Sequence, residues 1–247
     1  MKKMYQAFVG MLFLTLLCSA SACRVFANHA SEEVPSKEKA KKNYYVAPFT
    51  AIEVNGVADV SFAQSDKVEV EVSGPENYLS FVVIESDGGV LKVNTRKIGN
   101  KRVGKGLAVK IAAPTLLRLS NRGVGDFKTT TPLKTDRLTI DNLGVGDTRL
   151  THVECTDLTV NHKGVGDLRL SGTAVRATYK ASGVGNVNAK ELKAGEVSLE
   201  HTGVGDISCH ASQTIRIVSK GVGDVSYYGN PQVLSMSKKG VGSLEAK

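Results

Sequence analysis

The residues best placed for chemistry are aspartates that directly follow a repeated Gly-Val-Gly tripeptide. They are Asp126, Asp147, Asp167, Asp206 and Asp224, and Asn186 and Ser243 hold the same place in two further copies. Carboxylates in a row repel one another, and a divalent cation such as calcium would relieve that repulsion. Asp206 and Asp224 are the candidate cation site, since neither has the nearby Lys or Arg that follows the earlier aspartates. We expect no metal, however, because Asp, Asn and Ser all accept the turn N–H that a corner offers.

The histidines and cysteines of the repeats offer little further chemistry. His162 and His201 each precede a tripeptide by two residues, and they stand two repeats apart, about 10 Å at the spacing of β-strands. That is too far to share a metal, so we expect a polar ladder. Cys155 and Cys209 would be about 14 Å apart, beyond the roughly 7 Å that a disulfide allows, and Cys209 is expected to be a small buried hydrophobe. Neither catalytic residues nor a cofactor are predicted.

The elements that must position these residues follow from the repeat. Gly-Val-Gly begins at Gly123, Gly144, Gly164, Gly183, Gly203, Gly221 and Gly240, at spacings of 18 to 21 residues, and contains 14 of the 25 glycines. Alternating apolar residues beside each copy indicate short strands, with a turn and a third short strand completing the unit. About 20 residues at about 3.3 Å each give a coil with a perimeter of about 60 Å. Stacking such coils produces an all-β fold, the parallel β-helix or solenoid.

Each copy is expected to form a tight corner, in which glycine permits positive φ and a close approach of neighbouring coils. The predicted structural corner ladder consists of Gly123, Gly125, Asp126, Gly144, Gly146, Asp147, Gly164, Gly166, Asp167, Gly203, Gly205, Asp206, Gly221, Gly223 and Asp224. The central valine of each copy is expected to point into the core. A degenerate copy at 55–60 indicates that the same unit begins the domain. Leucine-rich repeats and calcium-binding nonapeptide rolls fit less well, because their consensus residues or their period are missing.

Residues 1–27 have the order of an export signal, with two lysines, an apolar run and then small residues. Cleavage at a small-x-small site would release a soluble product. Cleavage before Cys23 would instead give a lipoprotein acylated on that cysteine. Both outcomes stay open.

The periodicity of apolar residues divides the rest of the chain into two parts. Residues 28–43 lack an apolar period and are expected to form a flexible tether. Residues 44–247 are predicted to form a single β-helix domain, less regular over 44–115 and regular over 116–247. Period-two alternation at 67–72 indicates one of the strands of the less regular part.

Charge and composition limit the kinds of partner that the protein is expected to bind. The chain has 32 Lys and Arg against 24 Asp and Glu, a formal net charge of +8, no Trp and 6% aromatic residues. Basic runs at 37–42 and 96–105 are expected to be solvated, with attraction to an anionic envelope surface as the alternative. Few aromatic residues are available for stacking on bases, so nucleic acid is not an expected partner of this exported chain.

Three stretches carry a resemblance to a known family. They are Phe49 to Val60, Leu107 to Leu119 with Pro114, and the Gly-Val-Gly-Asp series. They resemble the head GIN domain of putative autotransporter adhesins, which is frequent in exported proteins of Bacteroidetes-type bacteria. The resemblance covers nearly all of residues 44–247 and implies a right-handed single-stranded β-helix. It brings no catalytic motif, so it implies no residue roles.

The sequence therefore favours a non-enzymatic, adhesin-like module of the cell envelope or surface that presents a rigid β-helix to a glycan or protein. We expect it in the periplasm, at the outer membrane or on the cell surface. The first alternative is a self-assembling envelope protein, joined end to end through the coil with Val241 and Leu244, which lacks an obvious cap. The second is a polysaccharide-acting enzyme, although only 98–106 is long enough to wall a cleft and it lacks paired carboxylates.

Overall fold

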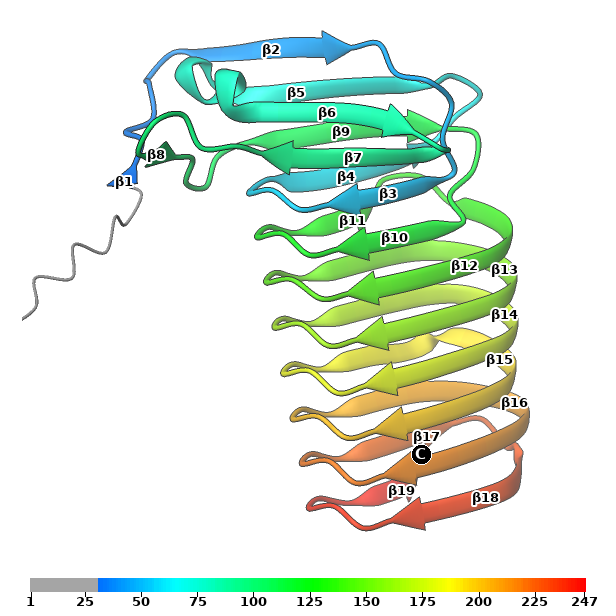
Figure 1. Ribbon diagram of the computed structural model, residues 1–247. Coiled ribbons are helices and arrows are strands. Elements are labelled where there is room, and N and C mark those ends of the chain that lie inside the picture. Colours follow the sequence, from blue (N-terminus) through cyan, green and yellow to red (C-terminus); the bar gives the residue numbers. More distant parts are fainter. Residues whose placement is uncertain (1–30) are drawn as a thin grey trace, which may run out of the picture. The chain divides into compact units, whose positions relative to one another are not determined.

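The Gly-Val-Gly copies mark one edge of a stack of coils in the computed structural model, which describes residues 31–247 (Figure 1). The predicted export signal and Cys23 lie outside these residues. After each corner the chain forms a strand that runs away, bends and returns one coil further along. Equivalent strands pair in parallel about 20 residues apart, so the predicted β-solenoid is confirmed.

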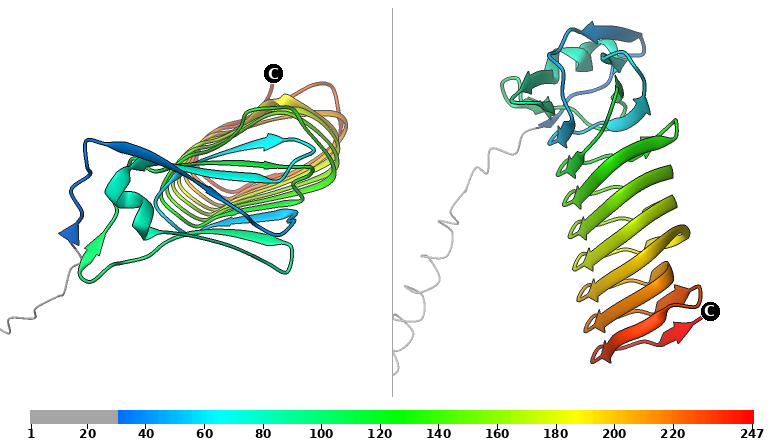
Figure 2. Two further views of the ribbon diagram at one scale, coloured as in Figure 1. Left: turned by 90° about the horizontal axis from the view of Figure 1, so that it is seen from above. Right: turned by 90° about the vertical axis from the view of Figure 1, so that its right-hand side faces the viewer.

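The regular coils are built from β10 to β19. These are β10 (Arg118–Asn121), β11 (Phe127–Thr129), β12 (Leu133–Asn142), β13 (Thr148–His162), β14 (Leu168–Ala181), β15 (Val187–His201), β16 (Ile207–Ser219), β17 (Val225–Tyr228), β18 (Gln232–Lys238) and β19 (Leu244–Ala246). As the chain descends in Figure 1, front strands run towards the corner edge and rear strands run away from it, so the solenoid is right-handed. Seen from above, the regular coils superimpose (Figure 2, left).

Alternation along the strands builds the core. One inward column, from one coil to the next, is Leu138, Leu158, Ala177, Val197 and Ile215, and a second is Ile140, Val160, Tyr179, Leu199 and Ile217. All of these side chains are buried, and Cys209 is also buried, as predicted. Burying a side chain of this size stabilises the fold by about 1.5–3 kcal/mol, so the columns carry much of its stability without tryptophan.

The coils have fewer separate sides than the sequence predicts. β13 to β16 are continuous over 13 to 15 residues and include the expected third strand. Val175, in the stretch where the sequence predicts a separate third strand, lies within β14 and is exposed. The bend in β14 lies near Gly172, where φ is 130° and the pairing with β13 shifts register. A glycine within a bent strand resembles a turn signal in the sequence, which is why the prediction was wrong here.

Two further coils precede the regular ones, in an order that differs from the chain order. β3 (Ala51–Val54) and β4 (Asp59–Gln64) pair with β10 and β11, and Val57 bridges to Val124. The degenerate copy at 55–60 therefore does form a corner. β7 (Val90–Thr95) and β9 (Ala108–Ala113) stack on the other side of β3 and β4.

Antiparallel strands complete this end of the molecule (Figure 2, right). β5 (Glu69–Pro75) pairs with β9, β2 (Lys39–Tyr44) pairs with β5, and β6 (Val82–Asp87) pairs with β7. A short 3₁₀ helix, η1 (Glu76–Phe81), joins β5 to β6 and buries Tyr78 and Phe81. Between residues 31 and 247 no helix has the length and hydropathy needed to cross a membrane.

The expected tether at 28–43 is wrong from Ser31 onward. β1 (Ser31–Glu32) pairs with β8 (Lys101–Arg102), and β2 pairs with β5 along six residues. Strands at a sheet edge are held through their backbone, so this Lys-rich segment needs no apolar period to be ordered. Residues 31–247 form one compact unit.

Candidate functional site

The two glycines of each corner are needed for different steric reasons. A Cβ on the first glycine, such as Gly164, would collide with the carbonyl oxygen of Gly144 in the preceding coil. A Cβ on the second glycine, such as Gly166, would collide with the Gly146 carbonyl oxygen, and Gly166 also has a φ of 130°. Both expectations, close approach and positive φ, are thus confirmed, but positive φ belongs to the second glycine alone.

The aspartates form a hydrogen-bonded row that links the coils to one another. Each backbone N–H donates, over 2.6–3.0 Å, to a side-chain oxygen one coil earlier: Asp126 to Asp59, Asp147 to Asp126, Asp167 to Asp147, Asn186 to Asp167, Asp206 to Asn186, Asp224 to Asp206 and Ser243 to Asp224. The sequence predicts a donor in the same turn, and the structure places the donor in the next coil. The backbone and hydroxyl of Ser243 accordingly lower the pKa of Asp224.

The candidate cation pair, Asp206 and Asp224, does occupy neighbouring coils. One oxygen of each carboxylate already accepts an N–H from the coil that follows. Within the described residues, no group of three or more His, Cys, Asp and Glu side chains is arranged to hold a metal ion. The geometry therefore shows these two carboxylates as hydrogen-bond acceptors that link neighbouring coils.

The central valines form an exposed apolar ridge, contrary to the expected core column. Val124, Val145, Val165, Val184, Val204, Val222 and Val241 are 39–69% exposed, and each bridges in parallel to the next. The reason is strict alternation, because residues one before and three after each valine face inward, as Gly123 and Phe127 do around Val124. We call this row the valine ridge.

A polar hollow of about 350 Å³ lies along the aspartate row, which follows the valine ridge by two residues in each coil. Its lining includes Arg169, Asn188, Ser208, Ser226 and Tyr228 together with Asp206 and Asp224. Ser208 donates to the Asn188 side-chain oxygen over 3.3 Å, so these outward side chains form a second ladder. The sequence shows this column two residues after each aspartate, but only the fold shows that it lines a hollow.

The histidines form part of a buried polar ladder, as predicted. His162 and His201 lie two coils apart, in register with Asn142, Ala181 and Ser219. The Asn142 amide nitrogen lies 3.2 Å from Nδ1 of His162. Burial lowers the pKa of both imidazoles, with partial compensation by nearby aspartates, so neutral rings are favoured.

Cys155 and Cys209, the two cysteines between residues 31 and 247, are free and buried. Burial raises the pKa of the Cys155 thiol to about 11 and that of the Cys209 thiol to about 12. Since the thiolate is the reactive form, neither cysteine is activated as a nucleophile.

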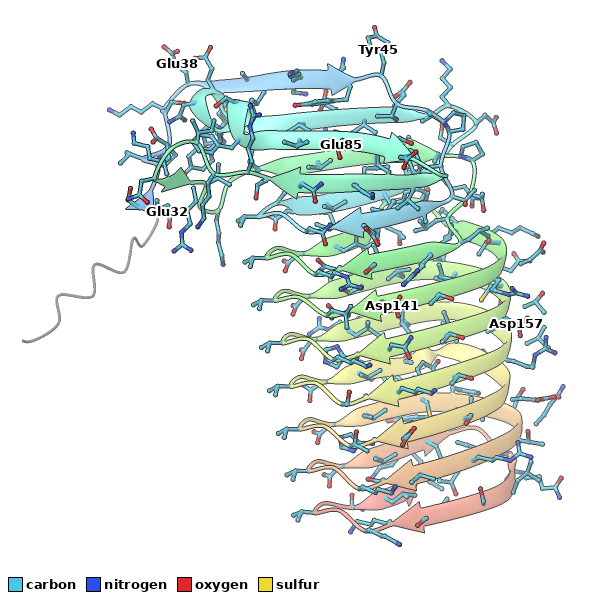
Figure 3. All side chains as sticks on the ribbon, in the orientation of Figure 1. Glu32, Glu38, Tyr45, Glu85, Asp141 and Asp157 are labelled. Carbon is cyan, nitrogen blue, oxygen red and sulfur yellow. The ribbon has the colours of Figure 1, made fainter. Side chains whose placement is uncertain are left out.

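A charged ladder lies on the coils away from the corner edge, and it was not predicted from the sequence. Arg137, Asp157, Arg176 and Glu196 stand in register in successive coils. Arg176 contacts Asp157 over 2.7 Å and lowers the pKa of its carboxyl. Asp157 lies at the outer surface of the coils, far from the corner edge (Figure 3). Alternating signs at this spacing could have been found in the sequence by aligning the coils.

The fold is a right-handed solenoid in which equivalent side chains of successive coils form outward-facing rows. The family model described as "Putative auto-transporter adhesin, head GIN domain" matches residues 48–231. The chain belongs to this family. Membership in an adhesin-like family indicates a surface or extracellular protein.

Solved structures agree with this assignment. A crystal structure of a putative adhesin from Bacteroides fragilis is 35% identical, with a TM-score of 0.83 over 86% of this chain and 99% of the other. A putative lipid binding protein from Parabacteroides distasonis (21% identity, TM-score 0.69, 87% and 100% coverage) and a putative adhesin from Parabacteroides merdae (23%, 0.58, 87% and 100%) share the fold. No curated protein sequence is significantly similar to the chain.

Proposed function

We propose that this protein is a non-enzymatic binding module of the cell envelope or surface, and that its ligand, a protein or a glycan, binds along the corner edge. The observation that carries the proposal is the exposure of the valine ridge. Glycine is required at the corner for stacking and aspartate for hydrogen bonding, whereas nothing in the coil requires an aliphatic side chain to face water. Apolar side chains that are exposed in a continuous row mark interaction surfaces.

The polar hollow complements the valine ridge. An apolar row suits the apolar side chains of a protein or the apolar faces of sugar rings. The adjacent amide, hydroxyl, carboxylate and guanidinium groups supply hydrogen bonds that fix a ligand's orientation. The two features run side by side over several coils, so an extended ligand can contact both.

The chemistry of the reactive residue types supports binding rather than catalysis. The thiols of Cys155 and Cys209 are buried and held protonated. His162 and His201 are buried in the coil interior. The corner aspartates are used as acceptors for backbone N–H groups.

The test compares three valines on the ridge with other exposed apolar residues. The triple variant Val165→Thr, Val184→Thr and Val204→Thr keeps branched side chains but replaces three methyl groups by hydroxyls. The control, Val175→Thr with Val233→Thr, changes residues that are 52% and 44% exposed away from the ridge. Parent and variants are applied to a glycan array and to immobilised collagen, laminin and fibronectin.

We expect the parent to bind at least one of these probes, with a loss of about tenfold or more in the ridge variant, since three lost apolar contacts exceed 1.4 kcal/mol. The control should bind like the parent. Equal binding by ridge variant and parent would contradict the assignment of the ligand site to the valine ridge.

Self-association is the second candidate, and exposed apolar residues of β18 favour it. Val233, Leu234 and Met236 are 41–44% exposed, and Val241 of the neighbouring corner is 69% exposed. In the described chain β18 pairs with β16 alone, so one of its edges is open to another strand. Sedimentation equilibrium should then show dimers that Leu234→Lys abolishes. A monomer at all concentrations would exclude this candidate.

A further inference from the structure

A basic hairpin takes the place of the corner in the coil formed by β7 and β9. Four residues, 55–58, join β3 to β4, whereas twelve residues, 96–107, join the equivalent strands β7 and β9. Two hydrogen bonds between the backbones of Ile98 and Lys101, of 3.0 and 3.1 Å, close the tip of the longer segment. The tip is therefore a defined turn. We call residues 96–105 the basic hairpin.

The basic hairpin concentrates positive charge around an exposed apolar residue. It contains no acidic residue, and its exposed cations are Arg96, Lys97, Lys101, Arg102 and Lys105. Lys101 pairs with Glu33 over 2.6 Å, and Arg96 donates to the Ser80 carbonyl oxygen over 3.2 Å. The other three cations have no ion-pair partner in the described part of the chain. Ile98, at the tip, is 42% exposed.

The described chain begins directly against this hairpin. The Ser31 N–H donates to the Asn100 carbonyl oxygen and the Glu33 N–H to that of Arg102, each over 2.8 Å. Cys23, which would be acylated if the chain is cleaved before it, precedes Ser31 by eight residues, which span at most about 28 Å when extended. An acyl chain on Cys23 would therefore hold the basic hairpin within reach of a bilayer surface.

We propose that the basic hairpin is a membrane contact site that binds the headgroups of anionic phospholipids. Exposed Lys and Arg side chains are attracted to an anionic lipid surface, and an apolar residue among them enters the boundary between headgroups and acyl chains. A single acyl chain anchors a protein only weakly, and a basic cluster supplies the second attachment. The hairpin binds lipid by itself, with or without acylation of Cys23.

The first experiment measures sedimentation with vesicles. The chain from Asn28 to Lys247, which contains the whole compact unit, is mixed with vesicles of phosphatidylcholine alone or with added phosphatidylglycerol. The test variant is Lys97→Gln with Arg102→Gln and Lys105→Gln. The control is Lys180→Gln with Lys190→Gln and Lys193→Gln, which removes the same charge from exposed positions in the regular coils.

Binding is expected only with phosphatidylglycerol, and it should weaken as salt is raised. The hairpin variant should lose about 100-fold in affinity, and the control should retain most of it. Equal losses in both variants would show attraction by overall charge and would overturn the proposal. So would equal binding to both kinds of vesicle, or a preference for soluble dextran sulfate over vesicles.

The second experiment places a fluorophore at the tip. The chain has no tryptophan, so Ile98→Trp introduces a single reporter, and Val175→Trp provides a matched one on an exposed coil position. Emission of the tip reporter should shift to shorter wavelength when phosphatidylglycerol vesicles are added, and the coil reporter should not shift. An unshifted tip reporter on sedimented protein would show that the hairpin does not contact the membrane.

Discussion

The regular coils and the N-terminal strands bury the same kinds of side chain, but only the coils repeat one pairing. In the coils, glycines allow close stacking, aspartates accept N–H groups from the next coil, and valines remain outside. In the N-terminal region β2, β5 and β6 pair antiparallel, and the coils stack out of chain order. A repeat thus specifies register wherever it is present, and segments without one depend on partners that only the folded chain brings together.

Replacing one glycine by alanine in each region should give the largest difference in stability between the regular coils and the N-terminal strands. Gly166→Ala places a Cβ against the backbone of the preceding coil at a positive φ, so we expect a loss of about 4 kcal/mol in the free energy of unfolding. Gly88→Ala, in the turn between β6 and β7, meets no atom within 4 Å and should cost about 1 kcal/mol through its φ of 56°. Urea unfolding measures both, and equal losses would refute the steric role of the corner.

The aspartate row gives the next largest effect. Asp147→Ala removes the acceptor for the Asp167 N–H and should cost about 1–2 kcal/mol. Asp147→Asn should cost less than about 0.5 kcal/mol, because Asn186 already accepts the Asp206 N–H in the same row. Urea unfolding of the two variants distinguishes hydrogen bonding from charge. If asparagine is as harmful as alanine, the carboxylate has a role other than that of an acceptor.

The buried histidines predict a pH dependence within the coils. Burial lowers the pKa of His162 and His201 below the ordinary value of 6.5, so near that pH the unfolded chain binds more protons than the folded chain. Stability should therefore fall as pH drops below about 6.5, until pH passes the lowered pKa values. The double variant His162→Asn with His201→Asn should show a flatter melting temperature between about pH 7 and 5, above the usual range of carboxyl titration. Parallel profiles of melting temperature against pH for parent and double variant would show that His162 and His201 do not cause the pH dependence.

How much the sequence predicted differs between the two regions for physical reasons. The period and the Gly-Val-Gly-Asp corners predicted the parallel pairing, its register and the buried place of Cys209. The predicted direction of the valines was wrong, because the alternation that places Gly123 and Phe127 inside turns the apolar valine between them outward. The pairing of β2 was missed, because a Lys-rich edge strand is held by its backbone. The hollow beside the aspartate row depends on stacking, which no single repeat shows.

The central claim is that the valines of the ridge do not stabilise the fold. The most direct test is therefore the variant for which the smallest change in the free energy of unfolding is expected. The free energy of unfolding of the triple variant Val165→Thr, Val184→Thr and Val204→Thr should lie within about 1 kcal/mol of the parent, since exposed substitutions cost little. A loss of about 3 kcal/mol or more, the expected cost of burying three hydroxyl groups, would show that the valine ridge belongs to the core and would contradict its assignment as a binding surface.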